Sequence, residues 1–251
     1  MFKNSFQQLL KSTLLLSVVA ISSNAFATKV VFDTSEGSIE VNLFDNGTPK
    51  TVENFLSYVN DGSYDNTVIH RSVPGFITQG GGFFFNGTLS LNKSATKPSV
   101  INEPVYSNRR GTIAMAKLGG QANSATNQWF FNLDNNQANL DVQNSGFTVF
   151  GEVIEGMDMV DNIAAIPLCN SIPMPDYNCG SGDVPSVENF VTIYSITISD
   201  TSPDSASNLN PVENTLIDGT GKNSTSDSGG STGLLTIFAL TLLMLNRRKV
   251  N

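Results

Sequence analysis

One histidine and two cysteines are the residues of this chain whose side chains most readily take part in chemistry. His70 lies beside Arg71, and nine residues separate Cys169 from Cys179. A histidine can transfer protons near neutral pH, and two cysteines can form a disulfide or contribute to a metal site. A structural zinc site needs about four ligands, and His70 is about a hundred positions from the cysteines. The pair therefore favours a disulfide over a metal site, provided that the chain meets an oxidising compartment.

The amino-terminal residues have the pattern of a secretory signal. Lys3 and Lys11 precede an apolar stretch, 14–21, which is followed by an Ala-Phe-Ala motif that ends at Ala27. A charged start, a short apolar centre and a small-residue cleavage motif predict that residues 1–27 are a signal peptide. The alternative is an uncleaved anchor, but the apolar centre is about half of the roughly 20 residues that a span needs. Export would oxidise the two cysteines, so we expect a disulfide that contributes roughly 2–3 kcal/mol.

The charge of the chain limits its partners. Between positions 28 and 230, 22 acidic residues outnumber nine basic ones, which gives this region a net charge of −13. A surface this negative repels phosphate backbones. We therefore expect no nucleic acid among the partners of the protein.

The carboxyl-terminal part changes composition sharply. Residues 199–230 are rich in Ser, Asn, Asp, Thr and Gly, which predicts a disordered linker. Residues 231–251 contain an apolar stretch, 233–245, and then a basic cluster, 247–249, as in a C-terminal stop at the inner membrane. This tail resembles the glycine-glycine C-terminal sorting tails of Gram-negative exported proteins, which are trimmed by a protease; an ordinary membrane anchor is the alternative. We expect a protein of the periplasm, tethered to the membrane or released at the cell surface after processing.

The remaining residues, 28–198, form one domain that is mostly of strand pattern. Lys29–Thr34 and Ser38–Phe44 flank a Ser-Glu-Gly turn, which predicts a hairpin. Thr48 followed by Pro49 predicts the start of a helix that ends near Asn60. Its apolar residues at helical spacing are Val52, Phe55, Leu56 and Val59. Further strands are expected at Thr67–Arg71, Phe76–Gln79, Thr112–Ala116, Gln128–Leu133, Thr148–Val153 and Asn189–Ser199, with a second helix at Met157–Ile163. Many short strands with two isolated helices favour a closed antiparallel barrel.

Four motifs in this domain carry a resemblance to a known family. They read IHRSVPGFITQGGG from Ile69, RGTIAMA from Arg110, SATNQWFFNL from Ser124 and FTVFGEVIEGMD from Phe147. In this order and at this spacing they resemble the cyclophilins, which are peptidyl-prolyl cis/trans isomerases. The resemblance covers nearly all of 28–198 and implies a mostly β fold, a closed eight-stranded antiparallel barrel capped by two α-helices.

The activity that this resemblance implies is rotation about the bond before proline. Resonance opposes that rotation with a barrier of about 18–20 kcal/mol, and uncatalysed exchange takes tens to hundreds of seconds. No bond is made or broken, so we expect no nucleophile, no metal and no cofactor. The enzyme must instead bind the twisted amide better than either planar form. His70 has no proton to transfer in such a reaction and is not expected to be catalytic.

The resemblance also assigns roles to individual residues. Arg71, Phe76 and Gln79 are expected to be catalytic, with Arg71 as the cation that weakens amide resonance. The residues expected to bind the substrate are Met115, Ala116, Gln128, Phe130, Leu140 and Phe147. Taken without the resemblance, Arg71 would be interpreted as a solvated surface group, and Phe76, Met115 and Phe130 as core residues.

The expected substrates are proline-containing peptides and unfolded exported proteins, on which the protein would act as a monomer. The alternative is a non-catalytic proline-binding chaperone or surface scaffold, which would have no need of Arg71 in the proline pocket. Phe147, where eukaryotic members often carry histidine, favours the bacterial exported branch. Two local elaborations, the insertion between Phe83 and Val100 and the loop between the cysteines, have no assigned role.

Overall fold

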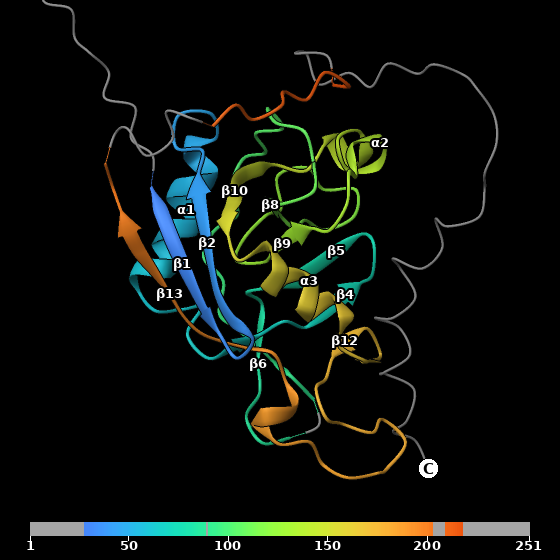
Figure 1. Ribbon diagram of the computed structural model, residues 1–251. Helices are drawn as coiled ribbons and strands as arrows, with labels where there is room; N and C mark the ends of the chain where they lie inside the picture. Colours follow the sequence, from blue (N-terminus) through green and yellow to red (C-terminus); the bar gives the residue numbers. More distant parts are fainter. Residues whose placement is uncertain (1–27, 89, 203–208, 218–251) are drawn as a thin grey trace, which may run out of the picture.

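The computed structural model describes residues 28–88, 90–202 and 209–217. The expected signal peptide, 1–27, the expected tail, 231–251, and most of the expected linker lie outside these residues. Within the described ranges the chain folds into a curled sheet with helices packed beside it (Figure 1). None of the helices in those ranges has the length and apolar content needed to cross a membrane.

The fold is mostly β. In the described part of the chain, eleven strands form one sheet in the order β4-β5-β9-β8-β10-β2-β1-β13-β3-β6-β7, and all the neighbouring strands are antiparallel. In chain order these strands are β1 (Lys29–Thr34), β2 (Gly37–Leu43), β3 (Thr67–Val68), β4 (Arg71–Val73), β5 (Ile77–Gly80), β6 (Phe83–Phe84), β7 (Asn92–Lys93), β8 (Thr112–Met115), β9 (Trp129–Asn132), β10 (Val149–Glu155) and β13 (Thr192–Asp200). A separate hairpin contains β11 (Leu168–Cys169) and β12 (Ile172–Pro173).

The sheet differs from the expected barrel. Its strand order is open, with β4 at one edge and β7 at the other, so a closed barrel of eight strands is not confirmed. One reason is that the expected strand 67–71 divides into β3 and β4. The amide of Ile69 donates to the carbonyl of Val191 at 2.9 Å, whereas the next amide, His70, donates to Gln79 at 3.1 Å. The backbone therefore leaves one part of the sheet and joins another within two residues, and the short β6–β7 pair from the insertion adds a further edge.

Three α-helices accompany the sheet in the described residues: α1 (Pro49–Asn60), α2 (Gln137–Leu140) and α3 (Met157–Ala165). The two helices expected from periodicity, α1 and α3, are confirmed, as is the hairpin of β1 and β2. The single turn α2 was not expected, because it lies in an Asn-rich segment without helical periodicity. α1 packs against β13, and α3 packs against β2 and β5.

The start of α1 is satisfied by a distant side chain. Thr48 makes no side-chain cap, and its hydroxyl donates to the carbonyl of Phe44 at 3.3 Å. Instead the carboxylate of Glu103 accepts from the amides of Lys50 at 3.3 Å and Thr51 at 2.8 Å. A negative charge at this end complements the unpaired amides of the first turn.

The main core lies between the inner face of the sheet and the helices. It contains a cluster of fully buried rings, in which Phe32 lies 5.0 Å from Trp129 and 5.5 Å from Phe131 between centroids.

A second apolar cluster contains Phe130, Leu140 and Val149, and a third contains Val68, Cys169, Met174 and Phe190. The third cluster also receives Phe83, Phe85 and Leu91, so the insertion and the loop between the cysteines pack together.

The described residues of the expected linker lie against the domain. In Figure 1 the segment 209–217, coloured orange to red, crosses the top of the view toward α2. Val212 accepts from the amide of Ser107 at 2.8 Å, the amide of Asn214 donates to Val105 at 2.8 Å, and Tyr106 pairs with Glu213. The composition of the segment does not reveal this pairing, because it uses backbone groups, which every residue carries.

Candidate active site

A row of directly opposed residues crosses five neighbouring strands on one face of the sheet. Arg71 on β4 pairs with Gln79 on β5, and Gln79 pairs with Phe130 on β9. Phe130 in turn pairs with Ala114 on β8, and Ala114 pairs with Val149 on β10. Opposed residues of neighbouring strands point to the same face, so register alone places a cation, an amide and three apolar side chains in line.

The alternation along β8 and β9 separates this row from the main core. Trp129 and Phe131 belong to the main core, whereas Phe130 between them belongs to the second cluster. On β8 the main core takes Met115, which is 0% exposed, and the second cluster takes Ala114. Met115, expected to bind the substrate, therefore lies on the face opposite Phe130, and Ala114 occupies the place in line with the site. Successive residues of a strand face opposite sides, and this is the signal that identifies Ala114.

The polar end of the row is a chain of side-chain hydrogen bonds. Nη1 of Arg71 donates to Oε1 of Gln79 at 3.5 Å, and Nε2 of Gln79 donates to Oε1 of Gln128 at 2.8 Å. Burial lowers the pKa of Arg71, but a guanidinium stays charged at any pH at which proteins fold. The site therefore has a partly buried cation that is oriented by Gln79, and Gln79 is in turn held by Gln128.

His70 lies beside this chain as a neutral ring. Its centroid is 4.6 Å from that of Phe83. Burial lowers the pKa of His70 to about 4, and its interaction with Gln128 offsets only part of that shift. At neutral pH His70 is thus uncharged, and it packs at the edge of the site without adding a second cation to Arg71.

The apolar end of the row is a cluster of aromatic and aliphatic side chains. Phe130 and Leu140 are 2% and 5% exposed, and the partly buried side chains of Phe76, Ala116 and Phe147 pack against them. The rings of Phe130 and Phe147 meet edge to face at 5.9 Å between centroids. Ile77, which was not among the expected site residues, also belongs to this cluster and is 5% exposed. Apart from Met115, the structure brings the expected site residues together.

A buried polar network holds two parts of this apolar cluster. Both carboxylate oxygens of Asp141, which follows α2, accept hydrogen bonds: from the hydroxyl of Ser107 at 2.6 Å and from the amide of Asn108 at 2.7 Å. The side chain of Asn136 donates to the carbonyl of Phe76 at 2.8 Å. Because these groups are buried, losing any one partner leaves another unsatisfied. The network therefore fixes the backbone at Phe76 and at α2, which carries Leu140.

The side chain of Gln128 packs closely against the backbone of Gly82. A Cβ atom at Gly82 would lie 2.5 Å from Cγ of Gln128, nearer than non-bonded carbon atoms can approach. Glycine at this position therefore leaves the room in which Gln128 reaches Gln79. The triple glycine of the first motif is explained in part by this contact.

These residues are suited to binding and polarising an amide rather than to acid-base or metal chemistry. Among the residues expected to act on the substrate, Arg71 has an ionisable side chain that stays charged, and His70 at their edge stays neutral. In the ranges that the structure describes, no three His, Cys, Asp or Glu side chains gather in a way that could hold a metal ion. Apolar side chains beside a cation can bind a proline ring while the cation donates to a neighbouring amide.

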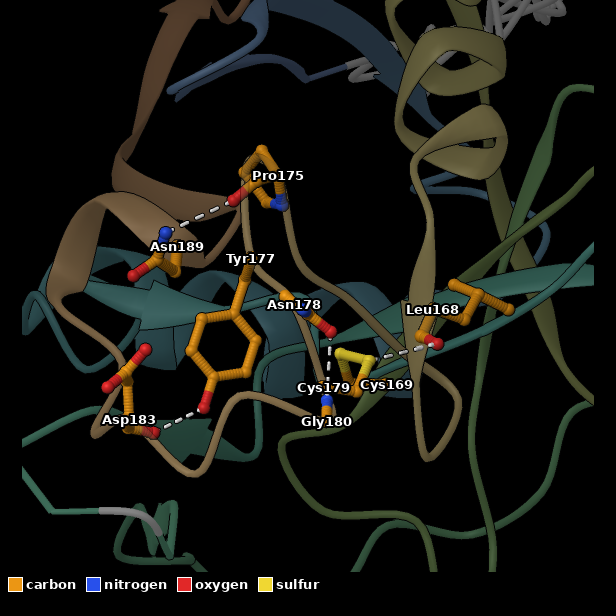
Figure 2. Close-up of a disulfide and its surroundings, with 9 residues drawn as sticks. All are labelled: Leu168, Cys169, Pro175, Tyr177, Asn178, Cys179, Gly180, Asp183 and Asn189. Atoms are coloured by element: carbon orange, nitrogen blue, oxygen red, sulfur yellow. Dashed lines mark hydrogen bonds between the residues drawn. A yellow bond between two sulfur atoms is a disulfide. The ribbon is translucent and has the colours of Figure 1, made fainter.

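The expected disulfide between Cys169 and Cys179 is confirmed, with 5.6 Å between the Cα atoms (Figure 2). It closes a loop that contains Tyr177, whose hydroxyl donates to the carbonyl of Asp183 just beyond the loop. The loop also touches the strand that carries Arg71, because the amide of Ser72 donates to the carbonyl of Ser171 at 2.7 Å. The disulfide thus braces a hairpin that lies against β4.

Comparisons with known proteins agree with this geometry. Residues 29–184 match the family model described as "Cyclophilin type peptidyl-prolyl cis-trans isomerase/CLD". The chain is 42% identical over 158 residues to the peptidyl-prolyl cis-trans isomerase of Acinetobacter baylyi, which covers 61% of this chain and 81% of the relative. It is also 42% identical over 143 residues to peptidyl-prolyl cis-trans isomerase B of Escherichia coli, with coverage of 55% and 84%.

The solved structures support the fold. A cyclophilin type peptidyl-prolyl cis-trans isomerase of Cryptosporidium parvum, crystallised in the presence of the dipeptide Ala-Pro, matches with a TM-score of 0.51 and 23% identity. The match covers 69% of this chain and 99% of the other. The curled sheet described above is thus shared with a solved protein of this kind.

Proposed function

Because the chain belongs to the cyclophilin type peptidyl-prolyl cis-trans isomerase family, we propose that its site acts on X-Pro bonds of unfolded exported proteins. Its activity is that of the family: it interconverts the cis and trans forms of these bonds. The observation that carries the proposed site is the row in which Arg71, Gln79 and Phe130 oppose one another beside the second apolar cluster.

The proposed mechanism lowers the barrier by electrostatics and by exclusion of water. The proline ring binds against Phe130, Leu140, Phe76 and Phe147, which removes water from the amide. Arg71 then donates to the substrate at the proline, which favours a pyramidal nitrogen or braces the carbonyl and so weakens resonance. A charged donor aimed at the twisted amide stabilises the transition state more than either planar state.

The amides of the site hold the cation and the substrate backbone. Gln79 orients Arg71, and the substrate residues before the proline run toward Gln128 and Ala116. The backbone amide of Ala116 already has a partner within the protein, because it donates to the carbonyl of Gln128 at 2.9 Å. Ala116 therefore offers its small side chain to the substrate, which leaves space for a residue before the proline.

The cellular setting is part of the proposal and rests on the sequence outside the described residues. The signal pattern of residues 1–27 supports export, and the tail 231–251 supports a transient attachment to the inner membrane. The disulfide supports an oxidising compartment, because such bonds are rare where thiols are kept reduced. We propose that the protein works there as a monomer, without a cofactor.

Removing the cation tests the proposed site. The purified chain and its Arg71→Ala variant are compared in a protease-coupled assay on an Ala-Pro peptide, with Lys50→Ala as a control for loss of a positive charge. Lys50 is exposed on α1. We expect kcat/KM to fall by about 10²-fold or more in Arg71→Ala and to stay unchanged in the control.

The other outcomes separate the alternatives. Full activity in a folded Arg71→Ala variant would reject the proposed mechanism. Absence of isomerisation in the folded parent chain, together with binding of proline peptides, would favour a non-catalytic chaperone. Cell fractionation, with mass spectrometry of both mature ends, tests export and processing of the tail.

A further inference from the structure

A strained turn precedes Phe147, the proposed wall of the proline site. Asn144, Ser145 and Gly146 have φ values of 51°, 64° and 70°. Three successive residues in the left-handed region are unfavourable for L-amino acids other than glycine. At Gly146 a side chain is excluded as well, because a Cβ atom would lie 2.8 Å from the carbonyl oxygen of Asp141. Contacts from outside the turn must therefore hold it in this conformation.

The ammonium group of Lys117 supplies the first of these contacts. Nζ donates to the carbonyl oxygens of Asn144 at 2.8 Å and Gly146 at 2.5 Å, and to Oδ1 of Asn102 at 3.1 Å. An ammonium has three donors, so these three acceptors satisfy it completely. Lys117 is half-buried, and burial lowers its pKa to about 8.

Asn102 completes the set of contacts. Its Nδ2 donates to the carbonyls of Ser145 at 2.8 Å and Gly146 at 3.0 Å. Its Oδ1 accepts from Lys117 and also from the hydroxyl of Thr148 at 2.8 Å. The carbonyls of all three left-handed residues thus converge on one lysine and one asparagine.

The same lysine also touches the wall itself. Nζ of Lys117 lies 4.9 Å from the centroid of the Phe147 ring, a distance suited to a cation–π contact. Phe147 is anchored on its other side, because its amide donates to the carbonyl of Leu140 at 2.8 Å. Its ring meets Phe130 edge to face.

We propose that Lys117 is a positioning residue that holds the 144–146 turn and thereby keeps Phe147 against Phe130 as a wall of the proline site. The inference rests on the proposed site, whose apolar end contains these two rings. Lys117 follows Ala116, and its three acceptors belong to Asn102, Asn144 and Gly146 rather than to the hydrogen-bonded chain of Arg71. Its loss should therefore weaken binding of the proline ring while the cation that promotes rotation stays in place.

The test compares three variants of the purified chain in steady-state kinetics with an Ala-Pro peptide. Lys117→Met keeps an unbranched stem and removes the donors, and Lys117→Arg keeps a charge with several donors. Lys97→Met is the matched control, because Lys97 also donates to a carbonyl, that of Ser57 at 2.8 Å, and lies 4.8 Å from the ring centroid of Tyr58. Circular dichroism shows whether each variant is folded.

We expect KM to rise about five- to tenfold in Lys117→Met, with kcat within about twofold of the parent. Lys117→Arg should restore most of the loss, and Lys97→Met should change neither constant. The nuclear Overhauser contact between the rings of Phe130 and Phe147 should disappear in Lys117→Met and remain in the other two variants.

The same measurements include results that would contradict the role of Lys117 or the proposed site. An unchanged KM and an intact ring contact in folded Lys117→Met would overturn the role of Lys117. If Arg71→Ala is inactive in the same assay, only this inference fails. If Arg71→Ala retains full activity, the proposed site itself fails, and the ring contact still reports separately whether Lys117 positions Phe147.

Discussion

Arg71 and Gln79 face each other across β4 and β5, and Nη1 of Arg71 donates to Oε1 of Gln79 at 3.5 Å. The other end of the same amide donates to Gln128 at 2.8 Å, so the Gln79 amide has its oxygen directed at the cation. A guanidinium that is steered in this way loses less freedom when it meets a substrate. This arrangement separates a residue that acts on the substrate from one that orients it.

Removing the Gln79 amide should therefore lower activity without abolishing it. In Gln79→Leu we expect kcat/KM to fall about tenfold, because one hydrogen bond to a charged group is lost and Gln128 loses its donor. Gln121→Leu, at an exposed glutamine outside the site, should be unchanged in the same coupled assay. Equal activity of Gln79→Leu and the parent chain would show that Arg71 needs no such support.

The ionisation of His70 can be followed directly, because the chain contains one histidine and its imidazole resonances need no assignment by mutation. Burial lowers the pKa of His70 to about 4, so an NMR titration should give a midpoint near 4. The unfolded chain takes up this proton near the ordinary value of about 6.5. The contribution of His70 to stability is therefore present above about pH 6.5 and is lost as the pH falls toward 4. A midpoint near 6.5 would contradict the buried, neutral ring.

The segment 209–217 should contribute to the stability of the domain. Leu209 packs against the second apolar cluster, so Leu209→Asp should lower the free energy of unfolding by about 1–2 kcal/mol. Leu216, which is 43% exposed, provides the control: Leu216→Asp should change it by less than about 0.5 kcal/mol. Thermal unfolding followed by circular dichroism measures both, and equal midpoints for the two variants would show that the segment is an inert linker.

The disulfide should stabilise the fold more than it affects catalysis. Replacing both cysteines by alanine should lower the free energy of unfolding by about 2–3 kcal/mol, because the unfolded chain regains the freedom of an open loop. Urea unfolding measures this change, and the parent chain in reductant should match the double variant. We expect kcat to change by less than about twofold, because β4 stays paired with β5. A large fall in kcat would mean that the contact from Ser171 to Ser72 is needed to place Arg71.

The sequence by itself determined the features that depend on short stretches of chain. The hairpin of β1 and β2, the helix Pro49–Asn60 and the helix at Met157 follow from turn residues and local periodicity. The disulfide was predicted from two cysteines together with an expected secretory signal. The four motifs, two of which carry Arg71, Gln79, Gln128 and Phe130, identified the family, because each motif is local and only their order had to be compared.

Tertiary structure decided what depends on contacts between distant segments. Met115 and Ala114 are neighbours, and only the pairing of β8 with β9 and β10 shows which of them faces Phe130; a shift of one residue would exchange them. Lys117 donates to the carbonyls of Asn144 and Gly146 across an interval that contains β9 and α2. The packing of 209–217 and the open order of the sheet depend on backbone hydrogen bonds between remote strands. Such bonds carry no side-chain signature, which is the physical reason why residue type and spacing could not foretell them.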